Sequence, residues 1–266
     1  MKNVTNHNSR DFDTESVDLE KVWRAEDSHF WYCSRNRWIL GALERLSCVP
    51  GDAFLEVGCG SGTVLRALRS RGFSAKGVET EEELVKMARC RCGSDNAFCQ
   101  DIRKTPLDLS PVKAIGFFDV LEHLDRPEDL IQASFRYAKS GTIFLVTVPA
   151  YQSDFTLYDE LGGHKKRYDP GDLRRLFEDC GLQFIYEEDF FKTIRFLIKF
   201  RRAMNWTRRG RVLGPEETKK YKEQELVVPV WPINSFLGWL SRLEYEGKLP
   251  LFGMKGASII GAARMT

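Results

Sequence analysis

The amino-acid sequence predicts an α/β fold, with a mainly parallel sheet that carries helices on both faces. Short apolar runs alternate with helical patterns, and a glycine-rich loop joins the first apolar run to the helical pattern after it. The 266 residues, 42% of them hydrophobic, are enough to bury a full core. Lys and Arg number 40 against 38 Asp and Glu, so the net charge of +2 argues against a nucleic-acid partner.

Each element is expected from its own pattern. Between residues 19 and 46, aromatic and aliphatic side chains recur at helical intervals and predict two helices. Apolar runs predict strands over 53–57, 75–79, 112–118, 142–148, 182–187 and 257–263, with a further short strand just before residue 100. Helical periodicity predicts helices over 63–71, 82–89, 127–139 and 170–180.

The same patterns divide the chain into segments. The polar residues 1–18 predict a mobile arm, and residues 19–50 a helical cap. The sheet and its helices are expected over 51–190 and 251–266. Residues 191–250 interrupt them before the last strand, and this insertion is far longer than the usual connection of about 2 to 6 residues. We interpret the insertion as a lid or substrate-binding segment.

The glycine-rich loop predicts a nucleotide site. Residues 54–63 read as a strand that runs into Gly58, Gly60 and Gly62 and then into a helix, which exposes free backbone N–H groups to a ligand. A dinucleotide-binding loop needs glycine or alanine in the sixth place, but counting from Gly58 this place holds Thr63. The next predicted strand ends in Glu79, which is placed to accept hydrogen bonds from both ribose hydroxyls.

These residues resemble the first motif of the class I S-adenosylmethionine-dependent methyltransferase family, which reads acid-x-G-x-G-x-G. Glu56 and the three glycines match it without a gap. The resemblance implies a Rossmann-like, seven-stranded sheet, S-adenosyl-L-methionine as methyl donor and S-adenosyl-L-homocysteine as product. It also implies that Asp101 accepts from the adenine amino group and that Ile102 offers its backbone N–H. The remaining cofactor contacts that it implies are Cys59, Thr80 and Phe118.

The segment 29–35 resembles an aromatic-plus-arginine segment that closes over the cofactor in the same methyltransferases. The resemblance implies that Arg35 pairs with the methionine carboxylate and that Trp31 or Tyr32 shields the sulfonium. Alternatively, Trp31 and Trp38 belong to the core on a seven-residue helical repeat, which leaves only Arg35 unexplained.

A second group of polar residues predicts either a metal site or a catalytic base. Asp119, Glu122 and His123 lie at i, i+3 and i+4, and His164 lies in a loop that reaches the same end of the sheet. Ubiquinone-pathway and small-RNA methyltransferases use a similar E-x-x-E-H segment to hold a metal, but the first acid here is Asp119. We therefore favour a pocket wall without metal. His123 and His164 are then candidate general bases, with His164 preferred because its loop is polar.

The L-E-H triplet at 121–123 and the G-H-x-x-R-Y segment at 163–168 resemble those of methyltransferases encoded among polysaccharide and natural-product biosynthesis genes. We expect methyl transfer to an oxygen or nitrogen atom of a small-molecule, sugar or lipid-linked acceptor. The alternatives are an NAD-dependent oxidoreductase or epimerase, which the early third glycine disfavours, and a non-catalytic cofactor-binding regulatory subunit. We expect a cytoplasmic protein, and the basic stretch 190–211 suggests peripheral contact with a membrane.

Overall fold

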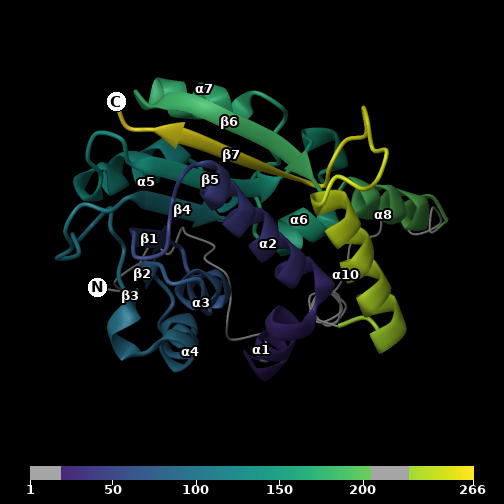
Figure 1. The fold of residues 1–266 in the computed structure, drawn as a ribbon, viewed down its shortest axis with the longest axis horizontal. Coiled ribbons are helices and arrows are strands. Elements are labelled where there is room, and N and C mark those ends of the chain that lie inside the picture. Colours follow the sequence, from purple (N-terminus) through teal and green to yellow (C-terminus); the bar gives the residue numbers. More distant parts are fainter. Residues whose placement is uncertain (1–18, 205–227) are drawn as a thin grey trace, which may run out of the picture.

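A seven-stranded sheet forms the centre of the computed structural model, which describes residues 19–204 and 228–266 (Figure 1). The predicted mobile arm and residues 205–227 of the predicted insertion lie outside the described residues. The strands are β1 (Ala53–Val57), β2 (Ser74–Glu79), β3 (Ala97–Cys99), β4 (Ala114–Phe118), β5 (Ile143–Pro149), β6 (Gln183–Phe190) and β7 (Ser258–Arg264).

The strand order is β3-β2-β1-β4-β5-β7-β6. The first five strands in this order are parallel, whereas β7 is antiparallel to both β5 and β6. The chain leaves β1 towards β2 and β3 on one side and later fills β4 and β5 on the other. In open α/β sheets, ligands bind where the strand order reverses in this way, which here is at the carboxyl ends of β1 and β4. The predicted Rossmann-like α/β fold is confirmed.

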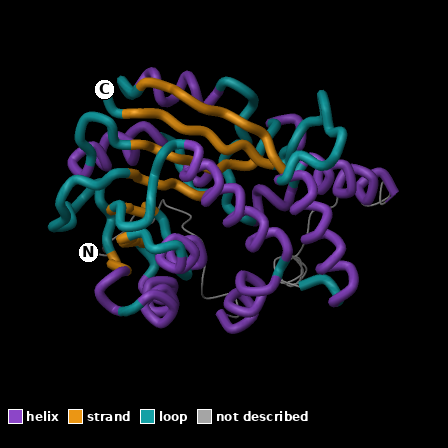
Figure 2. The backbone as a smooth tube through the Cα atoms, viewed as in Figure 1, coloured by secondary structure: helices purple, strands orange, loops and turns teal. Residues whose placement is uncertain are grey.

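Helices cover both faces of the sheet (Figure 2). Those of the described residues are α1 (Leu19–Ser28), α2 (Phe30–Arg45), α3 (Thr63–Ser70), α4 (Glu82–Cys92), α5 (Pro127–Ser134), α6 (Leu157–Leu161), α7 (Asp172–Asp179), α8 (Lys192–Met204) and α10 (Trp231–Tyr245). Apolar residues of α2, α3, α4 and α8 pack in one core layer, and those of α5 and α7 pack in the other.

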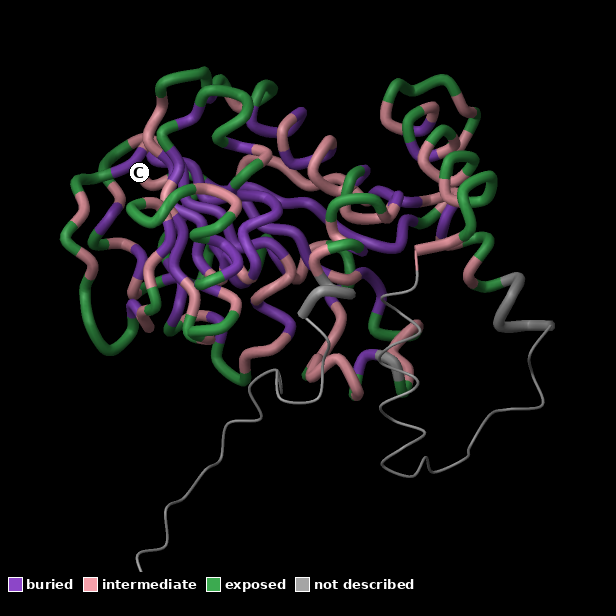
Figure 3. The backbone as a smooth tube through the Cα atoms, turned by 90° about the horizontal axis from the view of Figure 1, so that it is seen from below, coloured by how far each residue is buried: buried purple, intermediate pink, exposed green. Residues whose placement is uncertain are grey.

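Strand β4 contributes side chains to both core layers. Ala114 and Phe118 belong to the layer beneath α2 and α3, while Ile115 and Phe117 belong to the layer beneath α5 and α7. Side chains alternate between the two faces along a strand, so a run of apolar residues predicts a strand that is buried on both sides. Figure 3 shows the buried strands enclosed by partly exposed helices.

Several predicted boundaries differ from the structure for local reasons. The helix expected over 127–139 ends at Ser134, and a 3₁₀ turn follows at Phe135–Tyr137. The helix expected from residue 170 begins at Asp172, because Gly171 adopts a left-handed conformation as its N-cap. Apolar residues recur at helical intervals from Phe190 onwards, but β6 extends to Phe190, so helix α8 begins only at Lys192.

Candidate functional site

The glycine loop and the acid at the end of β2 lie together. The N–H groups of Gly58 and Cys59 both donate to the carbonyl of Val78, at 2.8 and 3.0 Å, which joins the loop to β2. The Gly60 N–H donates to Glu79 Oε2 at 2.9 Å, and the Thr80 N–H donates to Glu79 Oε1 at 2.6 Å. The Glu79 carboxylate therefore stands beside the loop at the carboxyl edge of the sheet.

The glycines of the loop allow close backbone approach. Gly58 has a φ of 77°, and a Cβ atom there would lie 2.6 Å from Val120 Cγ2. Gly60 also has a positive φ of 52°, but a Cβ atom there would meet nothing within 4 Å. A side chain is excluded at Gly58 by packing, whereas the space at Gly60 is open to a ligand that approaches the main chain.

Glu56 on β1 is buried beneath the loop, and its Oε2 atom has no hydrogen-bond partner. Burial raises the pKa of Glu56 well above its usual range, while the Arg35 guanidinium acts in the opposite direction. A buried carboxylate oxygen without a donor is costly, so this position suits a ligand that brings a donor or a positive charge.

Of the other residues expected to bind the cofactor, Asp101 is hydrogen-bonded to Arg103, and Ile102, Cys59 and Phe118 are buried. The Asp101 carboxylate accepts from Arg103 Nε at 2.9 Å and from Arg103 Nη2 at 2.8 Å. Ile102 is buried, and its side chain has no hydrogen-bond donor, so the expected contact can come only from its backbone N–H. Cys59 and Phe118 are also buried, and the Phe118 ring stacks on Phe54 with centroids 6.3 Å apart.

Helix α2 reaches the end of β4 through an ion pair. Arg35 Nη1 donates to Asp119 Oδ2, and Tyr32 lies beside them, with its ring centroid 5.5 Å from Arg35 Cζ. Trp31 instead packs on Phe191, with ring centroids 4.2 Å apart. Of the two tryptophans on the expected repeat, Trp38 is buried and Trp31 is partly buried, so both are core residues.

The spacing of Asp119, Glu122 and His123 would place the three side chains together if a helix began at Asp119, but the structure has no α-helix there. Residues Leu121–His123 form a 3₁₀ turn, and Asp119 itself has a positive φ of 56°. Asp119 accepts a hydrogen bond from the Thr147 hydroxyl at 3.0 Å and pairs with Arg35. It therefore faces α2 and β5 and stays outside the polar cluster described next.

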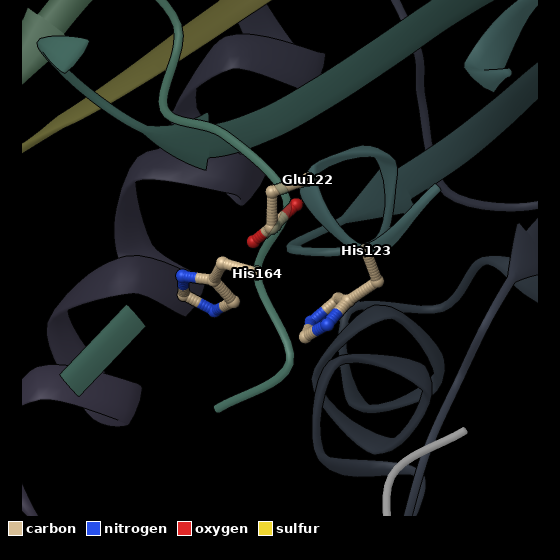
Figure 4. A group of neighbouring side chains, drawn as sticks. All are labelled: Glu122, His123 and His164. Carbon is tan, nitrogen blue, oxygen red and sulfur yellow. The ribbon is translucent and has the colours of Figure 1, made fainter. Parts of the chain in front are cut away.

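Glu122, His123 and His164 converge on one space (Figure 4). One ligand atom from each of the three lies within 4.8 Å of the others. Neither carboxylate oxygen of the fully buried Glu122 has a hydrogen-bond partner. Burial raises the pKa of Glu122 well above its usual range, and the neighbouring Asp119 raises it further. Burial and then His164 lower the pKa of His123 to about 4.

His164 has an orienting partner that sequence reasoning missed. Its Nδ1 atom lies 3.1 Å from Oδ1 of Asp159 on α6, and the same oxygen accepts from Arg167 Nε at 2.8 Å. Asp159 is buried, which by itself would raise its pKa, but hydrogen bonds from His164 and Arg167 lower this pKa to about 2. The carboxylate therefore stays charged and holds the imidazole through Nδ1, which leaves Nε2 as the free ring nitrogen.

Arg91 on α4 is a second missed residue. Its side chain is fully buried, and its Nη1 atom donates to Glu26 Oε2, Ser61 Oγ and Thr63 Oγ1 at 2.7, 2.6 and 2.7 Å. The guanidinium also lies 4.0 Å from the Trp23 ring centroid. Arg91 therefore fastens helix α1 to the loop that follows Gly60. No local sequence signal marks it, because an Arg on an amphipathic helix usually faces solvent.

The buried charge of Glu122 predicts a stability change. A glutamate in an unfolded chain has a pKa of about 4.3. Because the folded pKa is higher, the stabilisation by Glu122 is complete below the unfolded pKa and is lost as the pH rises through the folded pKa. In metal-free buffer, we expect Glu122→Gln to raise the free energy of unfolding by about 1 kcal/mol or more at pH 8, and by less at pH 5.

Urea denaturation at both pH values measures this effect. Glu82→Gln is the matched control, because the Glu82 side chain is 72% exposed on α4 and should change stability little. An equal effect of Glu122→Gln at pH 5 and pH 8 would show that the charge of Glu122 does not reduce stability.

The chain is similar in sequence to known methyltransferases. The sequence profile of a family described as methyltransferase domain matches residues 32–187. A ubiquinone biosynthesis O-methyltransferase from Hahella chejuensis is 28% identical over 151 residues, which make up 50% of this chain and 63% of the relative. The chain thus spans less than two thirds of the length of this relative.

Solved structures show the same fold. The methyltransferase solved in complex with the Haloferax volcanii Trm112 methyltransferase activator superposes with a TM-score of 0.59 at 18% identity, over 96% of this chain and 97% of that one. A SAM-dependent methyltransferase from Archaeoglobus fulgidus gives a TM-score of 0.52 at 17% identity, over 86% and 94% of the two chains. Because the family profile covers more than half of the chain, the protein belongs to the methyltransferase-domain family.

Proposed function

We propose that the enzyme transfers the methyl group to a hydroxyl oxygen of a small-molecule, sugar or lipid-linked acceptor. The observation that carries this proposal is the pairing of His164 with the buried Asp159, at the end of the sheet where the cofactor loop lies. A hydroxyl group must lose its proton during methylation, and an imidazole with a free Nε2 can accept it. The similarity to ubiquinone biosynthesis O-methyltransferases supports oxygen as the acceptor atom.

In this proposal the protein aligns three atoms and removes a proton. Methyl transfer from a sulfonium is an in-line displacement, so the acceptor oxygen, the methyl carbon and the sulfur must lie on one line. The bound cofactor would supply the methyl group and leave as S-adenosylhomocysteine, while His164 Nε2 would accept the proton of the acceptor hydroxyl. Asp159 holds the imidazole in the required tautomer and stabilises the imidazolium that results.

The cofactor is placed by residues of β1 and β2. Glu79 would accept hydrogen bonds from the ribose hydroxyls, and the loop at Gly60 would hold the methionine part of the cofactor. The unpartnered oxygen of Glu56 would accept from the methionine ammonium group. Asp101 and the Ile102 backbone N–H, which follow β3, would bind the adenine, and the Asp101 carboxylate would then share its hydrogen bonds with Arg103.

Glu122, His123 and His164 also fit a divalent cation. The two unpartnered oxygens of Glu122 supply the charge, the imidazoles supply nitrogen ligands, and Asp159 is the carboxylate that commonly orients a metal-bound histidine. A cation in this place, when bound, would lower the pKa of the acceptor hydroxyl. His164 would then act as a ligand rather than as the base.

Chelation distinguishes a general base at His164 from a metal ligand at His164. We expect His164 to act as the base, without a metal. Methyl transfer should continue within about twofold after dialysis against EDTA, because His164 alone can accept the proton. The measurement is turnover before chelation, after chelation, and after Mg²⁺ or Zn²⁺ is restored. Loss of turnover that metal restores would make His164 a ligand, and the base assignment would be wrong.

Product analysis tests the acceptor class. The enzyme is incubated with methyl-labelled S-adenosylmethionine and with matched pairs of hydroxylated and aminated phenols and sugars, and products are identified by mass spectrometry. Label on oxygen supports the proposal, whereas label on nitrogen alone contradicts it. Cofactor binding without transfer to any acceptor would favour a regulatory subunit, and binding of NAD in place of the cofactor would favour an oxidoreductase.

The fastening of α1 by Arg91 predicts an effect on cofactor binding. Arg91→Met leaves Glu26, Ser61 and Thr63 without their buried donor, which costs on the order of 3 kcal/mol. Because Ser61 lies in the glycine loop, we expect about tenfold weaker binding of S-adenosylhomocysteine, measured by calorimetry. Lys86→Met is the control, because its side chain is 54% exposed on the same helix. Wild-type affinity in Arg91→Met would show that the anchoring of α1 does not shape the site.

A further inference from the structure

Arg35 keeps an unused hydrogen-bond donor beside its ion pair with Asp119. Its side chain is only 12% exposed, and its Nη1 atom donates to Asp119 Oδ2. Among the described residues, the buried Nε atom of Arg35 finds no hydrogen-bond partner. Burial alone would lower the pKa of Arg35, but the Asp119 carboxylate raises this pKa above its usual value. The guanidinium therefore stays charged, and its Nε–H group is left for a ligand.

Asp119 is itself held in place from β5. The Asp119 N–H donates to the carbonyl of Thr147 at 2.9 Å, and the Thr147 hydroxyl donates to Asp119 Oδ1 at 3.0 Å. Thr147 is fully buried, and Asp119 has a positive φ of 56°. A residue other than glycine keeps such a backbone conformation only where its surroundings hold it. The contacts from Thr147 through Asp119 therefore fix the position of the Arg35 guanidinium.

The unpartnered oxygen of Glu56 lies close to this guanidinium. Burial raises the pKa of Glu56, and among the side chains that act on this pKa Arg35 has the largest effect, which lowers it. Glu56 comes two residues before Gly58, and a Cβ atom at Gly58 would lie 2.6 Å from Val120, the residue after Asp119. The free donor of Arg35 and the free acceptor of Glu56 therefore meet where the glycine loop touches the end of β4.

An amino-acid group complements this donor and this acceptor. Its carboxylate can accept from Arg35 Nε, while its ammonium donates to Glu56 Oε2 and favours the charged form of that carboxyl. Charges would then alternate from Glu56 through the ligand to Arg35 and Asp119. Because a guanidinium presents several N–H donors in a planar fork, Arg35 can bind the ligand carboxylate and Asp119 at the same time. Displacement of Asp119 would instead leave a partly buried carboxylate without its cation.

We propose that Asp119, fixed by Thr147, is a positioning residue that presents Arg35 Nε to the carboxylate in the methionine part of the cofactor. Asp119 would act through Arg35, without touching the cofactor itself. The inference rests on the proposed placement of the cofactor at the glycine loop, and it does not depend on the acceptor class.

Two ligands that differ in the amino-acid group test the proposal. S-adenosylhomocysteine carries this group, whereas methylthioadenosine has the same adenosine and sulfur without it. By calorimetry, we expect Asp119→Asn to weaken binding of S-adenosylhomocysteine by about tenfold and Thr147→Val by about threefold. Both variants should bind methylthioadenosine within about twofold of the wild-type affinity, because this ligand does not use Arg35. Asp129→Asn is the control, because Asp129 is 46% exposed and pairs with Arg126 at the start of α5.

Other results would overturn the proposal. Unchanged affinity in Asp119→Asn, or an equal loss for both ligands, would show that Asp119 does not position Arg35 for the carboxylate. Tighter binding of S-adenosylhomocysteine by this variant would show that Asp119 competes with the cofactor for Arg35. Glu79→Ala tests the cofactor placement separately, because the loss of a ribose contact should weaken both ligands. Wild-type affinity of Glu79→Ala for both ligands would mean that the placement itself is wrong.

Discussion

In the His164→Gln variant, we expect kcat to fall by about 10²- to 10⁴-fold, while the Kd for S-adenosylhomocysteine stays within about twofold of the wild-type value. Glutamine fills a similar volume but cannot accept a proton near neutral pH. The loss should therefore appear in the chemical step. The cofactor loop belongs to β1 and β2, whereas His164 lies in the loop after β5, so binding of the cofactor should survive.

Because Asp159 orients His164, removing its charge should also lower kcat, but by less than the loss of His164 does. Asp159→Asn removes the charge that holds His164 and Arg167, so we expect kcat to fall by about 10- to 10³-fold. Asp125→Asn is the matched control, because Asp125 is 80% exposed and pairs with Lys165, the residue next to His164. Full activity in His164→Gln with loss in Asp159→Asn would mean that Asp159 supports the fold rather than the chemistry.

Much of the fold follows from local patterns in the sequence. Strand β4 is read from five consecutive apolar or small residues, because a strand covered on both faces needs no polar positions. The boundaries were less predictable where backbone conformation decides them. Gly171 and Phe191 both have positive φ, and each comes directly before a helix that begins later than the apolar pattern suggests.

The cofactor side of the site was accessible to sequence reasoning for a topological reason. The glycine loop follows β1 and Glu79 ends β2, and neighbouring parallel strands bring their carboxyl ends to the same edge. The approach of His164 to Glu122 was predictable in the same way, since both follow strands that pair with each other, β4 and β5. Residues that lie far apart in sequence thus meet because the sheet aligns the strand ends.

The contacts made by the N-terminal helices α1 and α2 could not be predicted from the sequence in this way. Arg35 meets Asp119 and Arg91 meets Glu26 because α1 and α2 pack across the edge of the sheet, and no strand pairing sets that placement. The resemblance implied that Arg35 binds the carboxylate of the cofactor. In the structure, the backbone conformation of Asp119 directs the Asp119 carboxylate towards Arg35 instead. Whether the cofactor carboxylate displaces Asp119 from Arg35 depends on the relative strength of two ion pairs, which a motif does not encode.

Glu79→Ala should cause the largest loss of cofactor affinity. A hydrogen bond to a charged group contributes about 1.5 to 3 kcal/mol, so removing the acceptor of two ribose hydroxyls should weaken binding of S-adenosylhomocysteine on the order of 10²- to 10³-fold. Glu79 also accepts from the Gly60 N–H at 2.9 Å, so part of the loss should come from a less ordered loop. Glu79→Gln keeps one acceptor oxygen and should lose only about tenfold.

Calorimetric titration of the wild type, Glu79→Ala and Glu79→Gln with S-adenosylhomocysteine measures these affinities. NAD is titrated as a second ligand. Glu83→Gln on α4 is the control, because its side chain is 51% exposed and reaches Lys86 rather than the loop. If thermal stability is unchanged in Glu79→Ala while affinity is lost, the loss reflects ligand contacts rather than unfolding of the loop. Wild-type affinity in Glu79→Ala would place the ribose elsewhere and remove the link between the glycine loop and the acid of β2 from which the cofactor site was inferred.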